Sequence, residues 1–249
     1  MSSKIIELAT YATWNYRYLL ECCILGCQRV WGISPVVYTD SEGIATLAKN
    51  IGCEYRKIVM HPYSQVTALQ ILRNSCADCL LMIDADCWPL TMTPLEAVLA
   101  NMDDAECAFS GHIGNLDIPY LFRGSMNEPF SSLRSLLQKY PRFAQRWVNA
   151  ESANGGFLNT GCVVNLPLLY GGFAGYCPKH FSNLEIPDWI YSGDIWLSIY
   201  AIENELTIHH TENWHFNQNL DADIGICHWI GKGLGYEYPI NEYLSRIGV

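Results

Sequence analysis

The sequence has no uninterrupted apolar run that approaches the ~20 residues a membrane-spanning helix requires. Its first residues also lack the basic segment followed by an apolar stretch that marks a secretory signal. No internal repeat, low-complexity tract or obvious linker interrupts the chain. We therefore expect a cytoplasmic, intracellular protein without a transmembrane segment, folded as a single domain over residues 1–249.

Basic residues are scarce: 15 Lys and Arg stand against 25 Asp and Glu, for a formal net charge of −10. This balance disfavours long contacts with a nucleic-acid backbone or an anionic membrane. It does not exclude one nucleotide, because a bound metal ion can reverse the sign of the charge locally. Since 50% of the residues are hydrophobic and only 16% are charged, the chain is expected to be globular and well packed.

A second cysteine pair that would complete a zinc site is also missing. Cys76 and Cys79 have the right spacing for half of such a site, but the other cysteines are scattered through apolar runs. We expect these two at a packed helix end. The eleven cysteines are an odd number, and their pattern is typical of free thiols used as small core residues. A reducing compartment suits such thiols.

Short apolar runs alternate with helical patterns along the first 90 residues, which predicts an α/β fold with a mostly parallel sheet. The expected strands are 5–13, 34–40, 55–60 and 80–83, and the expected helices are 15–30, 41–51 and 65–76. We take residues 1–90 as a nucleotide-binding half and 91–249 as an acceptor-binding half. The second half is expected to contain a helix that begins with Pro94 at its first position, a strand at 107–111 and a helix at 192–203.

The strand expected at 80–83 ends in two carboxylates, Asp84 and Asp86. Pro89 follows, and we expect it to end the hydrogen-bond ladder. In open α/β sheets the carboxyl ends of the strands face the ligand crevice. Residues i and i+2 of a regular strand share one side, so both carboxylates are expected to converge on one divalent cation. The alternative is that they only cap the turn that follows.

Four short motifs occur in a fixed order. They are Asp84-x-Asp86, Asn159-x-Gly161, a helix with Asp194 in its first turn, and His228 followed by Gly231 and Lys232. With the order of the elements, these motifs resemble the GT-A glycosyltransferases, in particular the glycogenin and bacterial galactosyltransferase group, over nearly the whole chain. The resemblance implies one Rossmann-like domain, with a mixed, mostly parallel central sheet flanked by helices. The implied activity is that of a hexosyltransferase, which moves a sugar from a nucleotide-sugar, most often a UDP-sugar, to an acceptor.

The resemblance also implies a metal centre made by Asp84, Asp86 and His228. Two carboxylates and an imidazole suit Mn²⁺, with Mg²⁺ as a substitute. Such an ion acts as a Lewis acid on the diphosphate that leaves during the reaction. For His228 the alternative is a half-buried side chain that is satisfied by backbone groups.

The remaining implied site residues divide into two sets. The nucleotide-sugar would contact Ala9, Thr10, Tyr16, Asp40, Gly161 and Lys232, in addition to Asp84. Tyr16 would stack on the base, and Asp40 serves equally well as a plain strand-to-helix cap. The catalytic set is Asn159, which would reach sugar hydroxyls, and Asp194, which would orient the acceptor or act as its general base. The acceptor is expected to contact residues 114–153 and an aromatic cluster at 189 and 214–216.

Two departures from that group leave the retaining or inverting outcome open. Ile195 follows Asp194 where the group usually has Gln, and Lys232 lies two residues closer to the histidine than is usual. A haloacid-dehalogenase-type phosphatase is disfavoured by Trp88, since Thr or Val is normal there. A GT-A-like sugar nucleotidyltransferase and a non-catalytic nucleotide-sugar binding module stay open as alternatives. The sequence also leaves open a homodimer and whether the acceptor is a glycan, a protein or a small molecule.

Overall fold

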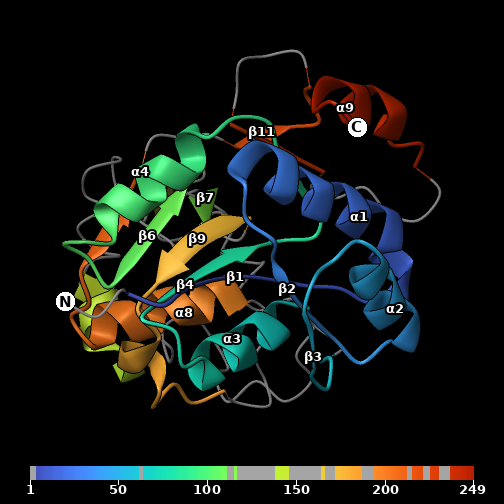
Figure 1. The fold of residues 1–249 in the computed structure, drawn as a ribbon. Helices are drawn as coiled ribbons and strands as arrows, with labels where there is room; N and C mark the ends of the chain where they lie inside the picture. The colour runs from blue at the N-terminus through green and yellow to red at the C-terminus, as the bar shows by residue number, and fades with distance from the viewer. Residues whose placement is uncertain are drawn as a thin grey trace.

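A computed structural model describes residues 4–61, 64–110, 115–116, 138–145, 164–165, 172–186, 193–211, 215–220, 225–229 and 236–249. Within these ranges a central β-sheet lies between two layers of helices (Figure 1). None of the helices in the described ranges combines the length and the hydropathy needed to cross a bilayer.

The central sheet has seven strands in the order β10-β6-β9-β4-β1-β2-β3. Only β9 runs antiparallel to its two neighbours, β4 and β6, and all other pairs are parallel. The expected α/β class, with a mixed and mostly parallel sheet, is therefore confirmed. The strands are β1 (Ile6–Tyr11), β2 (Val36–Thr39), β3 (Tyr55–Lys57), β4 (Cys79–Ile83), β6 (Cys107–Ser110), β9 (Phe173–Tyr176) and β10 (Ile208–His210).

Helices cover both faces of this sheet (Figure 1). Side chains of α3 and α8 pack with Leu80 and Met82 on one face, whereas α1 and α4 pack with Leu81 and Ile83 on the other. This alternation is what a central strand buried on both faces requires. The helices are α1 (Arg17–Gly26), α2 (Glu42–Asn50), α3 (Ser64–Asn74), α4 (Thr93–Asn101), α8 (Gly193–Glu203) and α9 (Ile240–Arg246). Shorter turns are η1 (Trp14–Tyr16), η2 (Cys27–Trp31) and η3 (Pro178–Phe181).

Helices and strands begin and end at local sequence signals, such as capping residues, where those signals are strong. Ser41 caps α2 by accepting a hydrogen bond from the Ile44 backbone N–H, and Gly52 follows the helix with a φ of +78°. The strand expected at 55–60 is shorter, since β3 ends at Lys57. The cysteine pair expected at a helix end lies instead beyond α3, with exposed Cys76 in a loop and Cys79 opening β4.

All ten cysteines in the described ranges are free thiols, as expected, and eight of them are buried. The eleventh, Cys162, lies outside the described residues. Thiols therefore serve this fold mainly as small apolar side chains.

A second, three-stranded sheet has the order β11-β12-β5, with β11 at His215–Asn217, β12 at Ile226–His228 and β5 at Cys87–Pro89. Pro89 is the last residue of β5, where it pairs with Ile226, so the strand ends at this proline as expected. The next residue, Leu90, donates its N–H to the carbonyl of Gly225. In an antiparallel pair these bonds alternate, so the missing N–H of Pro89 points away from β12 and removes no bond.

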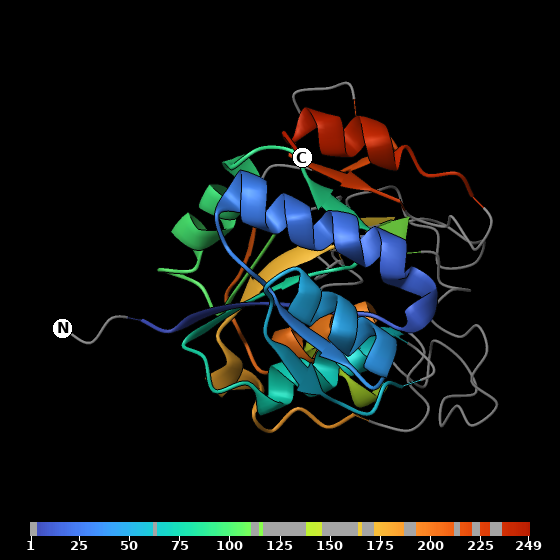
Figure 2. The ribbon, with the colours of Figure 1, turned by 45° about the vertical axis from the view of Figure 1, so that its right-hand side comes forward.

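An aromatic cluster joins this small sheet to α1 and α9. Trp88 is fully buried, with its ring centroid 4.7 Å from that of Tyr243 and 5.0 Å from that of Trp229. Its indole N–H donates to the Leu19 carbonyl of α1 at 3.1 Å. Gly26 has no room for a Cβ atom, because Tyr243 fills that space. In Figure 2, α9 and the small sheet lie side by side, next to α1.

Candidate metal centre

The predicted acidic motif forms a tight turn at the carboxyl end of β4. Asp84, Ala85 and Asp86 lie between β4 and β5, and the turn is closed by a 2.9 Å hydrogen bond from the Cys87 N–H to the Asp84 carbonyl. The expectation that the two carboxylates share one side of a regular strand was therefore wrong, because the strand has already ended at Ile83. Their relative placement depends on the turn and on their neighbours, not on strand periodicity.

Asp84 is held by the neighbouring strand. Since Ala9 pairs with Met82 in the parallel β1–β4 register, Tyr11 at the end of β1 lies beside Asp84. The Tyr11 hydroxyl donates to Asp84 Oδ1 at 3.0 Å. Burial and then the negative charge of Asp86 raise the pKa of Asp84 to about 6, opposed by His228 and by the Tyr11 hydrogen bond. The turn is therefore prepared for a cation that would relieve this repulsion.

Asp84→Asn is expected to stabilise the metal-free protein at pH 7. The folded-state pKa of Asp84 lies above that of the unfolded chain, so the unfolded state loses its proton first as the pH rises. The free energy of unfolding therefore falls between about pH 4 and 6. Because Asp84 is partly exposed and solvent screens its charge, the loss is about 1–2 kcal/mol at pH 7. Thermal unfolding should show a Tm higher by about 2–6 °C at pH 7 and no gain at pH 4. An equal rise in Tm at pH 4 and pH 7 would contradict the raised pKa of Asp84.

Asp86 and His228 form the second contact of the site. His228 is the last residue of β12 and is only 5% exposed. Its Nε2 lies 3.4 Å from Asp86 Oδ1. The Trp229 N–H donates to the Asp86 carbonyl at 3.0 Å, so the backbone of the small sheet fixes Asp86 next to this imidazole. Two groups that the sequence analysis assigned to one ion are thereby brought together from distant parts of the chain.

A third potential ligand was missed by the sequence analysis. Liganding atoms of Asp86, Cys87 and His228 all lie within 4.8 Å of one another, which makes them a group able to hold a metal ion. The group differs from the expected set of Asp84, Asp86 and His228 by one member. The thiol directly after the motif is visible in the sequence, but its pairing with His228 across the β5–β12 ladder is not.

Two tyrosines, Tyr16 and Tyr238, are affected by the negative charge of the acidic turn. Tyr16, at the end of η1, is 45% exposed. Partial burial and then the negative charges of Asp86 and Asp84 raise its pKa. The pKa of Tyr238 is also raised, by burial and then by Asp86. Its ring centroid lies 5.0 Å from that of Tyr236 and 5.4 Å from that of Trp229. Aromatic rings therefore border the turn from both ends of the chain.

The other residues expected at the nucleotide are less uniform. Ala9 is fully buried in the hydrophobic core of β1, and Asp40 accepts a 3.2 Å hydrogen bond from the Met60 N–H, which connects the loops after β2 and β3. Thr10 is also fully buried, but its Oγ1 has no hydrogen-bond partner within the part of the chain described here. A buried hydroxyl without a partner is uncommon and fits a site completed by a ligand.

The rest of the predicted site is only partly described. Asp194 lies in the first turn of α8, as expected, but its side chain is outside the description. Asn159, Gly161 and Lys232 lie outside the described residues, as does most of the expected acceptor region at 114–153. Their roles stay predictions.

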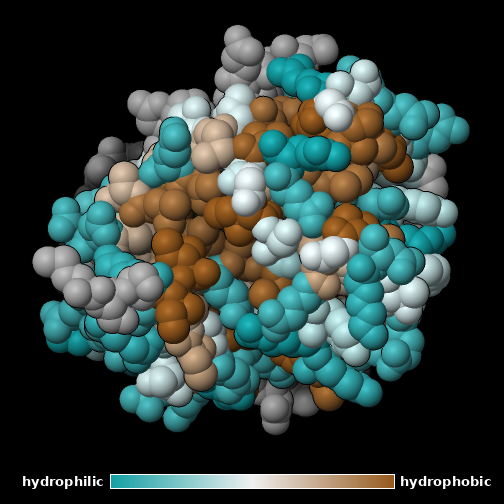
Figure 3. Space-filling view, viewed as in Figure 1, coloured by the Kyte–Doolittle hydropathy of each residue, from teal (hydrophilic) through white to brown (hydrophobic). Residues whose placement is uncertain are grey.

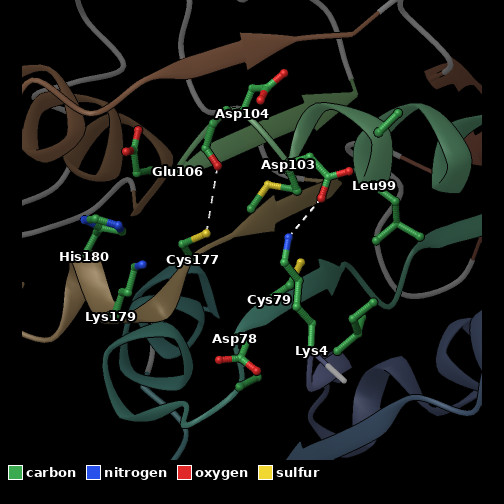
Figure 4. A pocket seen from close by; sticks show the side chains of 15 residues that line it. Lys4, Asp78, Cys79, Leu99, Asp103, Asp104, Glu106, Cys177, Lys179 and His180 are labelled. Atoms are coloured by element: carbon green, nitrogen blue, oxygen red, sulfur yellow. Dashed lines mark hydrogen bonds and ion pairs between the residues drawn. The ribbon is translucent and has the colours of Figure 1, made fainter. Parts of the chain in front are cut away.

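A cavity of about 810 Å³ lies at the opposite, amino-terminal edge of the sheet (Figure 4). Lys4 and Asp103 both line it and form an exposed ion pair at 2.9 Å. Leu99 and Met102 of the α4 region contribute apolar lining. On the side of the molecule seen in Figure 1, apolar side chains reach the surface between α4 and α1, as Figure 3 shows. Because ligands of open α/β sheets bind at the carboxyl ends of the strands, the acidic turn is the stronger candidate for chemistry.

The α/β sheet of this chain, with its acidic turn at the carboxyl end of the central strand, has the fold of solved GT-A-type glycosyltransferases. The galactosyltransferase LgtC, solved with donor and acceptor sugar analogs, matches with a TM-score of 0.54 and 12% identity, covering 97% of this chain and 95% of that one. Glucosyl-3-phosphoglycerate synthase from Mycobacterium tuberculosis, solved with Mn²⁺, UDP and phosphoglyceric acid, matches with a TM-score of 0.53 and 12% identity, covering 99% and 80%.

These likenesses establish the fold and nothing finer, since the identities are low. No family model matches the chain, and no curated protein does. The glycogenin-like group indicated by the motifs is therefore not distinguished from other GT-A structures by these comparisons.

Proposed function

We propose that this protein is a metal-dependent glycosyltransferase that moves a sugar from a UDP-sugar to an acceptor. The observation that carries the proposal is the 3.4 Å approach of Asp86 to His228 at the carboxyl edge of a GT-A-type sheet. A carboxylate and an imidazole placed together suit a divalent ion, Mn²⁺ or Mg²⁺. Two proteins of the same fold carry names and ligands that agree with this chemistry: LgtC with its sugar analogs, and the mycobacterial synthase with Mn²⁺ and UDP.

The reaction leaves a nucleoside diphosphate, on which negative charge increases as the bond to the sugar breaks. A divalent ion, when bound, supplies Lewis-acid stabilisation of that charge. Asp86 and His228 would hold the ion, and Asp84 would face it from the other side of the turn. The Tyr11 hydroxyl would orient the Asp84 carboxylate through its hydrogen bond to Oδ1. The chain thus orients its ligands before any substrate binds.

Residues 1–90 would bind the nucleoside, whereas residues 91–249 would bind the acceptor and add further contacts to the donor. Tyr16 would stack on the base. The carboxylates of the acidic turn contribute to its raised pKa, which supports a position near that turn. Thr10 Oγ1 would obtain from the nucleotide the partner that it lacks in the described chain. In the second half, Asp194 and Asn159 would act on the acceptor and the transferred sugar. We place Gly161 and Lys232 at the donor because of their motifs alone.

A panel of UDP-, GDP- and TDP-sugars with Mn²⁺ tests the proposal by thermal stabilisation and donor hydrolysis. A ligand at about 100 times its Kd stabilises the folded state by about 2.7 kcal/mol, so the matching donor should raise Tm by several degrees. EDTA should remove this shift. If no sugar donor stabilises the protein, the proposal fails. Stabilisation without turnover in the presence of varied acceptors would instead indicate a binding module.

Tyr11→Phe is expected to weaken binding of Mn²⁺ and UDP about 3- to 10-fold, because it removes the hydrogen bond that orients Asp84. Isothermal titration with UDP at saturating Mn²⁺ measures this effect. Tyr38→Phe is the matched control: Tyr38 neighbours Tyr11 on β2 and also donates to a carboxylate, but to Glu7 at 2.9 Å. The prediction is contradicted if both variants lose affinity equally, since that would indicate a general effect on the sheet.

A further inference from the structure

A buried thiol adjoins the two side chains that are proposed to hold the metal ion. Cys87 opens β5, is fully buried, and pairs with His228 across the β5–β12 ladder. Its Sγ is part of the compact group of liganding atoms, all within 4.8 Å of one another, that includes Asp86 and His228. The acidic motif alone would supply only oxygen atoms, so the thiol changes the chemical character of the group.

The ladder itself directs the thiol toward the imidazole. The Trp229 N–H donates to the Asp86 carbonyl, so Asp86 and Trp229 form a hydrogen-bonded pair of the antiparallel ladder. The next pair, Cys87 and His228, is then of the non-hydrogen-bonded type. Side chains approach each other most closely in such pairs. Asp86 reaches the same imidazole from the turn, with its Oδ1 3.4 Å from Nε2.

We propose that Cys87 Sγ is a third protein ligand of this centre, which therefore binds thiophilic ions such as Zn²⁺ and Co²⁺ far more tightly than Mn²⁺. The inference rests on the proposed function only in placing a metal ion at the acidic turn. A carboxylate, an imidazole and a thiolate would form a ligand set of the kind that Zn²⁺ and Co²⁺ prefer over Mn²⁺. When the metal–sulfur bond forms, the thiol proton leaves to solvent and no group is oxidised or reduced.

A second buried thiol, Cys23, lies near the acidic turn but outside the group of liganding atoms. Cys23 of α1 is also fully buried, and its Sγ lies 3.6 Å from the Asp84 carbonyl oxygen as a weak donor. Cys23 and Cys87 belong to the same hydrophobic cluster. Cys23 is not a member of the compact liganding group. It therefore provides a matched control for the loss of a buried thiol near the acidic turn.

The experiment is a titration of the metal-free protein with Co²⁺, followed by absorption spectroscopy. A sulfur-to-cobalt charge-transfer band in the near ultraviolet reports a thiolate ligand directly. The band is expected in the wild type and in Cys23→Ala, and it should be lost in Cys87→Ala. Competition with Zn²⁺ should show affinity reduced about 100-fold in Cys87→Ala, whereas Mn²⁺ affinity changes about threefold or less. Cys87→Ser keeps nearly the size of the side chain and replaces the alanine variant if that variant does not fold.

The outcomes separate this inference from the proposed function. Co²⁺ binding without a charge-transfer band in the wild type, or a band that persists in the Cys87 variant, overturns the thiolate ligand. UDP binding with Mn²⁺ is measured on the same samples. If UDP binds with Mn²⁺ while the band is absent, the proposed function stands and the thiol ligand does not. If the band is present but no UDP-sugar binds, the metal centre stands and the glycosyltransferase assignment fails.

Discussion

Asp86→Asn is expected to lower kcat/KM by about 10³-fold or more while leaving the fold intact. The amide keeps the size of the side chain but removes the negative charge that faces His228 at 3.4 Å. A metal ion would then lose its charged ligand from the turn, and with it several kcal/mol of stabilisation of the leaving diphosphate. The Asp86 side chain is 24% exposed, and its contact with His228 is an ion pair only when the imidazole is protonated.

The measurement is a donor-hydrolysis or transfer assay over a range of Mn²⁺ concentrations, combined with direct titration of Mn²⁺. Both the metal affinity and the maximal rate should fall in the variant. Asp103→Asn provides the control, because Asp103 is an exposed carboxylate in an ion pair with Lys4 at the opposite edge of the sheet. Activity of Asp86→Asn within about tenfold of the wild type at saturating metal would remove this carboxylate from the mechanism.

The elements that could be predicted are those specified by short stretches of sequence. Four apolar residues in a row, 80–83, are enough for a central strand because both faces of that strand are buried. Ser41 and Gly52 mark the two ends of α2 through a side-chain cap and a left-handed backbone conformation. In each case the physical cause lies within a few residues of the structure that it produces.

The features that were missed depend on pairing between distant segments. The small sheet places β5 against β12, and nothing in either segment alone indicates its partner. Pro89 ends β5, as expected, but it gives no indication of the strand with which this segment pairs. Cys87 gained its place beside His228 from the same pairing. The motif residues Asp84 and Asp86 were identified, but their geometry was not, because a turn replaces the assumed strand periodicity.

The residues of the candidate site also divide into those that the sequence indicated and those that depend on pairing between distant segments. Tyr16 was expected near the nucleotide because of the resemblance to GT-A glycosyltransferases, and its pKa is raised in part by both carboxylates of the turn. Tyr238, which responds to Asp86 as well, had no local signal that would have identified it. Tyr11 was part of an expected strand, but its hydroxyl contact with Asp84 follows only from the parallel register of β1 and β4.

Trp88→Ala is expected to be the most destabilising single substitution near the site. Trp88 is completely buried, packs on Trp229 and Tyr243, and donates its indole N–H to the Leu19 carbonyl. Removing a fully buried Trp side chain costs about 3–5 kcal/mol, since the cavity left behind closes only in part. For a chain of this size that corresponds to a Tm lower by about 10 °C. Thermal unfolding followed by circular dichroism measures it.

Trp88→Phe keeps a six-membered aromatic ring but loses the five-membered half of the indole, and with it the N–H donor to Leu19. Its cost should be about 2–3 kcal/mol, from the lost hydrogen bond and the smaller cavity together, and Trp14→Ala, at a ring that is 49% exposed, should cost less still. Since Trp88 follows Cys87 directly on β5, loss of its packing should also weaken metal binding at temperatures well below Tm. If Trp88→Ala lowered Tm while metal affinity stayed unchanged, the small sheet would be a support for α9 and not for the metal centre.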